Sequence, residues 1–367
     1  MKPKFNPSTL AKLELRGFKQ FVASGLLSFG VFFAQDAASE LPKFASKPEF
    51  VGVVEELSVS PALFSTQSFE WNDVERQRVV PAKLYIPVGP LKTGEVPLVV
   101  FSHGIGGSKE SYRYLGSYFA AHGYASLHVQ HVGSDRQIWR GNPFSIVTRL
   151  TDAAQEGEAL NRVNDVKFAL NQLLAEPIGS AIDASRLVTA GHSYGANTTM
   201  LLAGARVNVK GMPTSVKDPR FSAAILISAP PFYGMGDPQK ILSDIDIPSL
   251  HITATADDIN IPGYNSGVAD RLALYSAIGA TTHAAKVLAV FKDGSHSIFT
   301  DRKGTGGVAL NPKVKVATRQ LAVAFLDCLQ AADQCFLEQW TDQNKELLAQ
   351  FERNGFHGLN SAINVSQ

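Results

Sequence analysis

Residues 186–205 read RLVTAGHSYGANTTMLLAGA, and this stretch carries the strongest signal for the fold of the chain. Leu187–Ala190 is short, apolar and β-branched, as in a buried parallel strand, whereas 197–205 is rich in Ala, Leu and Met, as in a helix. Between them lies Gly191–Gly195, a G-x-S-x-G pattern that in this context is typical of a nucleophile elbow with Ser193 at its tip. The same five residues can also occur by chance in an ordinary turn, so neighbouring segments must decide.

The composition is that of a globular protein with a large core. The chain has 367 residues, of which 45% are hydrophobic and 18% charged, and its formal net charge is +1. An apolar content this high excludes a disordered chain. A net charge this close to zero gives no reason to expect a nucleic acid as partner, and no partner protein is implied either.

The N-terminus has the pattern of an export signal. Basic residues between Lys2 and Lys19 precede an apolar run at 21–34, and small residues follow that run. This order predicts a signal peptide within residues 1–40 and a periplasmic or secreted protein. An uncleaved N-terminal anchor and an amphipathic helix packed on the domain are the alternatives, because the basic region is long and the cleavage site is poor.

The chain contains two cysteines, Cys328 and Cys335, which in an exported protein are expected to form a disulfide. A continuous helix would hold them about 10 Å apart along its axis, which is too far for a bond. The helix is therefore expected to break at 331–333. The alternative is a pair of unpaired, half-buried thiols.

Strand and helix patterns alternate along the chain after an antiparallel start. This order predicts an α/β fold, in which a mostly parallel central sheet has antiparallel N-terminal strands and helices on both faces. The main domain is expected at 45–335, with a possible cap loop at 132–154 and a C-terminal helical extension at 336–367. The expected strands are 51–59, 64–71, 79–87, 96–102, 124–131, 187–190, 223–228, 247–253 and 286–291, and the expected helices are 109–121, 156–174, 197–205, 268–278, 314–329 and 336–353.

A serine nucleophile needs a base within hydrogen-bond reach and a third group that orients the base. His296 follows the last strand of the alternating region, in a loop that can bring its imidazole to Ser193. The third group is expected after strand 247–253, where Asp257 and Asp258 are adjacent. We favour Asp257 as the acid and keep Asp258 as the alternative. The resulting order of serine, acid and histidine is one of the known triad orders.

A glycine-rich loop, His103–Gly107, follows the strand at 96–102. We expect the Ile105 N–H in this loop and the Tyr194 N–H after the nucleophile to form an oxyanion hole. A nucleotide-binding loop is the other use of such glycines, but the spacing is not G-x-G-x-x-G. The His103 side chain either contacts substrate or only buttresses the loop. No residues have metal-ligand spacing, so neither a metal nor another cofactor is expected.

Five segments carry a family resemblance as a set: FSHGIGGSKESYRYL at 101–115, HVQHVGSD at 128–135, GHSYGA at 191–196, TATAD at 253–257 and GSHSIFTDR at 294–302. Together they resemble the serine hydrolases known as predicted dienelactone hydrolases. That group is similar to bacterial relatives of platelet-activating-factor acetylhydrolase and, more distantly, to polyester-cleaving cutinases. The resemblance covers about residues 65–302. It implies an α/β-hydrolase fold and hydrolysis of carboxylic esters.

The resemblance bears on the acid and on the substrate. Asp257 matches the family's T-G-T-x-D strand end, with Ala254 in place of the glycine, whereas an ungapped match to the cutinase pattern selects Asp258. Dienelactone hydrolases have a cysteine nucleophile where this chain has Ser193. The platelet-activating-factor enzyme has its acid after the earlier strand, where this chain has Ser228. The substrate of neither namesake can therefore be carried over.

These observations predict a serine carboxylic-ester hydrolase that works through an acyl-enzyme on a small-molecule or lipid-like ester. A lipase, a phospholipase and a polyester hydrolase are the alternatives among enzymes. A catalytically silent binding protein on the same fold is the alternative outside enzymes. Candidates for substrate contact, each of which can equally be structural, are Trp139, Phe232, Tyr233 and Ile261.

Overall fold

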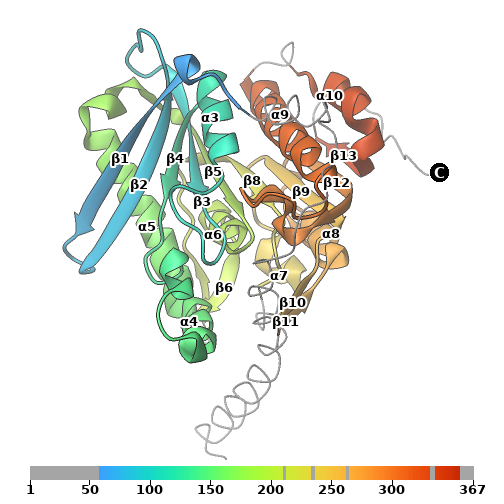
Figure 1. The fold of residues 1–367 in the computed structure, drawn as a ribbon, viewed down its shortest axis with the longest axis horizontal. Helices are drawn as coiled ribbons and strands as arrows, with labels where there is room; N and C mark the ends of the chain where they lie inside the picture. The colour runs from blue at the N-terminus through green and yellow to red at the C-terminus, as the bar shows by residue number, and fades with distance from the viewer. Residues whose placement is uncertain (1–57, 210–211, 233–235, 262–263, 331–334, 356–367) are drawn as a thin grey trace, which may run out of the picture.

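The computed structural model describes residues 58–209, 212–232, 236–261, 264–330 and 335–355 (Figure 1). The expected signal segment at 1–40 lies outside the described residues. So does most of the strand expected at 51–59, and residues 58–59 at its end form no strand. In the described part, a large sheet lies between two layers of helices.

The sheet has nine strands in the order β1-β2-β4-β3-β5-β8-β9-β12-β13. The strands from β4 to β12 in that order are parallel, whereas β1, β2 and β13 at the two edges run antiparallel to their neighbours. The fold class expected from the sequence is thus confirmed. The bounds are β1 (Phe64–Asp73), β2 (Arg78–Pro87), β3 (Val96–Ser102), β4 (Ala125–Val129), β5 (Ile182–His192), β8 (Phe221–Ile227), β9 (Ser249–Ala256), β12 (Lys286–Ser295) and β13 (Leu348–Asn354).

The helices divide between the two faces of the sheet. In β3, Leu98 and Val100 face one layer while Val99 and Phe101 face the other, so every residue of the strand is buried. A strand covered on both faces reads as an unbroken apolar run, as this one does. One layer holds α5 (Glu156–Ala175), α6 (Tyr194–Ala203), α7 (Pro238–Leu242) and α8 (Val268–Ala277), and the other holds α3 (Arg113–Ala121), α9 (Leu310–Gln330) and α10 (Leu337–Asn344).

The end of the chain corrects one expectation. The helix expected at 336–353 ends at Asn344, and after a 3-10 turn at Lys345–Leu347 the chain forms β13, an edge strand paired with β12. A register shift in this pairing lets Leu348 and Phe351 both face the same core cluster although they are three residues apart. Three-residue spacing of apolar residues is typical of a helix, so the bulge explains the wrong prediction.

Smaller differences also have local causes. The helix expected at 109–121 begins only at Arg113, because Tyr112 has a left-handed backbone with φ 60°. The possible cap at 132–154 contains short helical turns and α4 (Ile146–Ala153). Two short hairpins were not expected, β6 (Arg206–Val209) with β7 (Met212–Ser215) and β10 (Ile259–Ile261) with β11 (Tyr264–Ser266).

Cys328 and Cys335 form the expected disulfide, with the two Cα atoms 4.1 Å apart. The helix that carries Cys328 ends at Gln330, and the expected break at 331–333 lies outside the described residues. Across the described ranges, none of the helices is long and apolar enough to cross a bilayer.

Candidate active site

Ser193 lies at the turn between β5 and α6. Its backbone has φ 56° and ψ −124°, a strained conformation that costs on the order of 1–3 kcal/mol. The turn requires glycine on both sides. A Cβ at Gly191 would lie 2.2 Å from the carbonyl oxygen of Gly195, and a Cβ at Gly195 would lie 1.9 Å from that of Ser102. Local sterics therefore fix the residue types around Ser193.

Two hydrogen bonds connect Ser193 to His296 and Asp257. His296 Nε2 lies 2.8 Å from Ser193 Oγ, and His296 Nδ1 lies 2.7 Å from Asp257 Oδ1. Asp257 follows β9 and His296 follows β12, and these two strands are parallel neighbours, so their carboxyl ends bring the side chains together. The other carboxylate oxygen of Asp257 accepts a hydrogen bond of 2.7 Å from the Thr253 hydroxyl. Both carboxylate oxygens are thus engaged.

The two candidate acids have different surroundings. Asp257 is fully buried, whereas Asp258 is exposed and its carboxylate lies beside Gly267. Burial alone would raise the pKa of Asp257. The hydrogen bond and charge of His296, together with the charge of Arg271, outweigh burial and hold that pKa well below its usual range. Of the two aspartates, Asp257 is the one in contact with His296.

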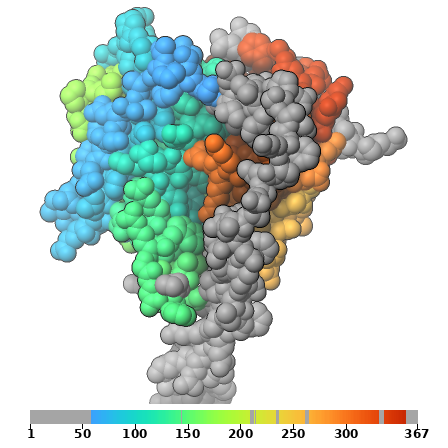
Figure 2. All heavy atoms as spheres, viewed as in Figure 1, coloured from blue at the N-terminus to red at the C-terminus, as the bar shows by residue number. Residues whose placement is uncertain are grey.

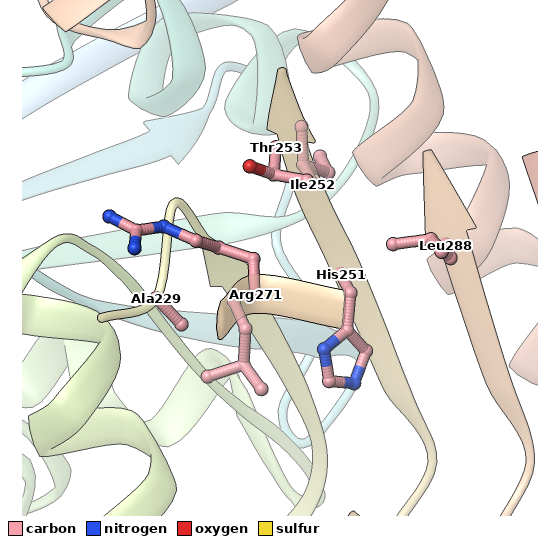
Figure 3. Close-up of a pocket in the computed structure, with 7 residues that line it drawn as sticks. Ala229, His251, Ile252, Thr253, Arg271 and Leu288 are labelled. Atoms are coloured by element: carbon pink, nitrogen blue, oxygen red, sulfur yellow. The ribbon is translucent and has the colours of Figure 1, made fainter. Parts of the chain in front are cut away.

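Arg271 from α8 lies behind the Asp257 carboxylate. Its Nη2 is 3.6 Å from Asp257 Oδ1, and its Nη1 donates a hydrogen bond of 3.0 Å to the carbonyl of Gly267. Within the described residues, its buried Nε and Nη2 have no hydrogen bond, so the guanidinium acts on Asp257 through charge. A small cavity beside Arg271 has room for about one water molecule (Figure 3). Its lining also includes Ala229, His251, Ile252, Thr253 and Leu288.

The glycine loop lies against the nucleophile and leaves one N–H free. A Cβ at Gly104 would lie 3.3 Å from the Ser193 Cβ, which shows how close the loop is. The Gly106 and Gly107 N–H groups donate to the carbonyls of Ser134 and Gly104 at 2.8 and 3.0 Å. In the described ranges, no hydrogen bond uses the N–H of Ile105 or of Tyr194. Tyr194 is the first residue of α6, where N–H groups lack intrahelical partners and favour an anion.

A buried tyrosine–histidine pair connects this loop to the loop of His296. The Gly104 N–H donates to the Tyr112 hydroxyl at 3.5 Å, and that hydroxyl lies 2.8 Å from His192 Nδ1. His192 Nε2 lies 3.0 Å from the carbonyl oxygen of His296. Burial, helped by the charge of His296, lowers the pKa of His192 to about 3, so the ring stays neutral near pH 7. Because the His296 carbonyl can only accept a hydrogen bond, the neutral His192 ring donates through Nε2 and accepts from the Tyr112 hydroxyl at Nδ1.

The residues expected to contact substrate lie in different places. His103 is buried, and its ring nitrogens contact the Gly104 carbonyl and the His131 N–H, so its position fits the buttressing role and not substrate contact. Phe232 is half-buried against the core. Tyr233 lies outside the described residues, and Ile261 ends β10.

The segment expected as a cap lies partly on the glycine loop. Trp139 is 48% exposed, and its indole donates a hydrogen bond of 3.0 Å to the Gly106 carbonyl. Further along, Phe144 is 92% exposed and is followed by α4, which forms part of the lower surface in the space-filling view (Figure 2). A half-exposed aromatic side chain, that of Trp139, therefore lies directly beside the glycine loop.

Several residues around the site were not singled out from the sequence. Tyr112, His192 and Arg271 are buried polar side chains whose partners lie far along the chain, so no local pattern marks them. Arg162 left a weak signal. Helix α5 buries Glu158, Arg162 and Asp165 on one face, although an amphipathic helix usually keeps charges on its wet face.

Residues 60–246 match a protein-family model described as chlorophyllase, which is just over half of the chain. The chain belongs to the chlorophyllase family. The matched region of this chlorophyllase-family chain includes the glycine loop and the elbow, and it ends before Asp257 and His296.

Known proteins similar to this chlorophyllase-family chain include an acetylhydrolase and an esterase of known structure. It is 27% identical over 187 residues to platelet-activating factor acetylhydrolase of Cavia porcellus, and the match covers 41% of this chain and 40% of that protein. The matched part thus spans less than half of the relative. The solved structure of a ferulic acid esterase from Streptomyces cinnamoneus has a TM-score of 0.50 at 20% identity, covering 73% of this chain and 90% of that one. The fold is that of α/β-hydrolases, and the family assignment agrees with the family resemblance that the sequence segments carry.

Proposed function

We propose that the protein is a serine carboxylesterase whose triad is Ser193, His296 and Asp257. The observation that carries the proposal is the continuous hydrogen-bonded chain from Ser193 Oγ through His296 to the buried Asp257 carboxylate. The free N–H groups of Ile105 and Tyr194 support an oxyanion hole beside it.

The proposed reaction has two halves. Ser193 Oγ attacks the ester carbonyl while His296 Nε2 takes its proton, and the Ile105 and Tyr194 N–H groups stabilise the tetrahedral oxyanion. His296 then returns the proton to the departing alkoxide, which leaves as the alcohol and gives an acyl-Ser193 ester. In the second half, water attacks this ester as His296 takes its proton, and the carboxylic acid is released. The Asp257 carboxylate orients the ring and stabilises the imidazolium.

The substrate is a carboxylic ester, and a lipid-like ester is the second candidate. The exposed Trp139, whose indole binds the glycine loop, favours it, and Phe144 is a second exposed aromatic side chain in the same segment. The family description names chlorophyll and the relative's name names platelet-activating factor, so both compounds belong in the assay panel. A polyester film belongs there as well.

An ester screen with Ser193→Ala as control tests the function. p-Nitrophenyl esters from acetate to palmitate should be hydrolysed by the wild type, and Ser193→Ala should lose this activity by several orders of magnitude. Preference for micellar over monomeric esters would identify a lipase or phospholipase. Absence of turnover on the whole panel by folded wild type would instead favour a binding protein.

We also propose that the protein is exported. The basic and apolar pattern of residues 1–40 and the Cys328–Cys335 disulfide support this, since disulfides persist in oxidising compartments. N-terminal sequencing of the protein from the periplasm or medium should find a start beyond the apolar run. An intact Met1 on protein recovered from the cytosol would contradict export.

A further inference from the structure

Arg162 is a buried cation next to the candidate oxyanion hole, in the middle of α5. It is 0% exposed and is among the largest fully buried side chains. Its Nη2 donates to the His103 carbonyl, its Nη1 to the Ser134 hydroxyl at 2.8 Å, and its Nε to the Thr198 hydroxyl at 3.0 Å. One guanidinium thus connects three segments that are far apart in the sequence.

On the loop side, Arg162 is connected to the backbone both before and after Ile105. Its contact with the His103 carbonyl fixes the peptide that directly precedes the one bearing the Ile105 N–H. After Ile105, the Gly106 N–H donates to the Ser134 carbonyl at 2.8 Å, and the Ser134 side chain is itself held by Arg162. The Ser134 hydroxyl in turn donates a hydrogen bond of 2.8 Å to the Glu158 carboxylate. Arg162 therefore anchors the glycine loop on both sides of Ile105, directly at the His103 carbonyl and through Ser134 at Gly106.

On the helix side, Arg162 contacts the residue that carries the other candidate donor. The guanidinium carbon lies 4.4 Å from the centre of the Tyr194 ring, a cation–π distance. Its Nε also holds the Thr198 hydroxyl, which lies 3.2 Å from the Tyr194 carbonyl. In the described ranges the buried Tyr194 hydroxyl makes no hydrogen bond, so the guanidinium is the polar contact of this side chain.

The charge of Arg162 persists at neutral pH in spite of its burial. Burial lowers its pKa to about 10, against the opposing effects of Tyr194, Glu158 and Asp165. A buried cation is costly unless it is paired and hydrogen-bonded. At this position it also lies close to where negative charge would develop in an ester's transition state, and low-dielectric surroundings strengthen such an interaction.

From this geometry we propose that Arg162 is a positioning residue of the oxyanion hole, which holds the Ile105 and Tyr194 N–H groups in the orientation that an oxyanion needs. The proposal rests on the proposed esterase function. A residue that only braced α5 against α6 would affect folding stability. A residue that aims the two donors must in addition affect the chemical step in folded enzyme.

The first test compares Arg162→Met and Arg162→Lys with Arg319→Met. Arg319 is a matched control, because it is also a buried arginine over a tyrosine ring. Its guanidinium carbon lies 4.5 Å from the centre of the Tyr118 ring, on the opposite face of the sheet from Arg162. With p-nitrophenyl butyrate, Arg162→Met should lower kcat about 100-fold, the effect of losing one oxyanion donor, with KM within about twofold. Arg162→Lys keeps the charge but not the planar set of donors, so its kcat should lie between those of the wild type and Arg162→Met. Arg319→Met should keep kcat within about twofold.

The second test uses an oxygen-to-sulfur substitution in the substrate. A thionoester develops its negative charge on sulfur, which accepts hydrogen bonds more weakly than oxygen. The wild type should therefore prefer the oxygen ester strongly, and Arg162→Met should lose most of that preference. If Arg162→Met does not fold, Ser134→Ala and Thr198→Val each remove one of its contacts and should show the same loss in smaller measure.

The outcomes separate this proposal from the proposed function. If folded Arg162 variants melt earlier but keep the wild-type kcat and oxygen preference, Arg162 is structural and the inference is wrong. If the folded Ser134→Ala and Thr198→Val enzymes also keep the kcat and oxygen preference of the wild type, the inference is wrong as well. If the wild type itself hydrolyses no ester, or hydrolyses esters no faster than Ser193→Ala does, the proposed function fails first.

Discussion

Asp257 and Asp258 are adjacent in the sequence, but their carboxylates are in different environments. Asp257 is buried and in contact with His296, Thr253 and Arg271, whereas Asp258 is exposed. Only a carboxylate that is hydrogen-bonded to the imidazole can hold the ring in its productive tautomer. The difference between the two residues can therefore be measured directly.

Asp257→Asn should lower kcat by roughly 10³–10⁴-fold, because an amide at this position favours the wrong tautomer of His296. Asp258→Asn should change kcat by less than about threefold. Steady-state kinetics with p-nitrophenyl butyrate on both purified variants measure this. An inactive Asp258→Asn beside an active Asp257→Asn would reverse the assignment.

At the level of single residues, the sequence predicted the candidate residues that lie at the ends of strands. Ser193 and His296 each follow a strand, and the order of strand ends predicted both, whereas the third strand end left Asp257 favoured and Asp258 as the alternative. Arg162 and His192 were missed, because their roles depend on contacts formed only in the folded structure. Burial of a polar side chain leaves at most a weak sequence pattern, such as the charged face of α5 that carries Arg162.

At the level of elements, the elbow is the most constrained turn in the fold. Gly191 and Gly195 each pack against backbone atoms of neighbouring segments, and a backbone atom cannot move aside as a side chain does. Gly157, in the first turn of α5, instead has open space where a Cβ would be. Gly157 can therefore serve as the control when Gly191 and Gly195 are replaced by alanine.

Gly191→Ala and Gly195→Ala should each prevent the native elbow from forming and leave little folded, active enzyme, since a Cβ would lie 2.2 and 1.9 Å from backbone oxygens. Gly157→Ala should be neutral or stabilise the fold by up to about 1 kcal/mol, because alanine is the better helix former. Urea unfolding and circular dichroism measure both effects. A native-like, active Gly195→Ala enzyme would contradict the elbow geometry.

The parallel strands β3 and β8 were predictable because each is covered on both faces and so reads as a nearly unbroken apolar run. The edge strand β13 was not, because its bulge gives Leu348 and Phe351 a helical spacing. Pairing with β12 at the sheet edge, and not local propensity, decides the conformation of residues 348–354.

At the level of the whole molecule, buried histidines connect stability to pH. Burial lowers the pKa of His192 and His251 to about 3 and that of His128 to about 4, with smaller contributions from nearby charges. In an unfolded chain a histidine takes up a proton near pH 6.5. Below that pH the unfolded state therefore binds more protons than the folded state, and stability is lost as the pH falls.

The free energy of unfolding should thus decrease between pH 7 and pH 5, by on the order of 2 kcal/mol for each of these histidines. Urea titrations at pH 7.5, 6 and 5 measure the change. His251→Gln should reduce the pH dependence, because the amide does not titrate. A stability that is the same at pH 7.5 and pH 5 would contradict burial of these rings in their neutral form.

The most direct test of the central claim is the site of covalent labelling by a fluorophosphonate, read by mass spectrometry of the digested protein. A single adduct on Ser193 is predicted, with none in Ser193→Ala and strongly slowed labelling in His296→Ala, because the reagent reacts with an activated serine. Folded wild type that stays unlabelled, or that carries its adduct on another residue, would contradict Ser193 as the nucleophile.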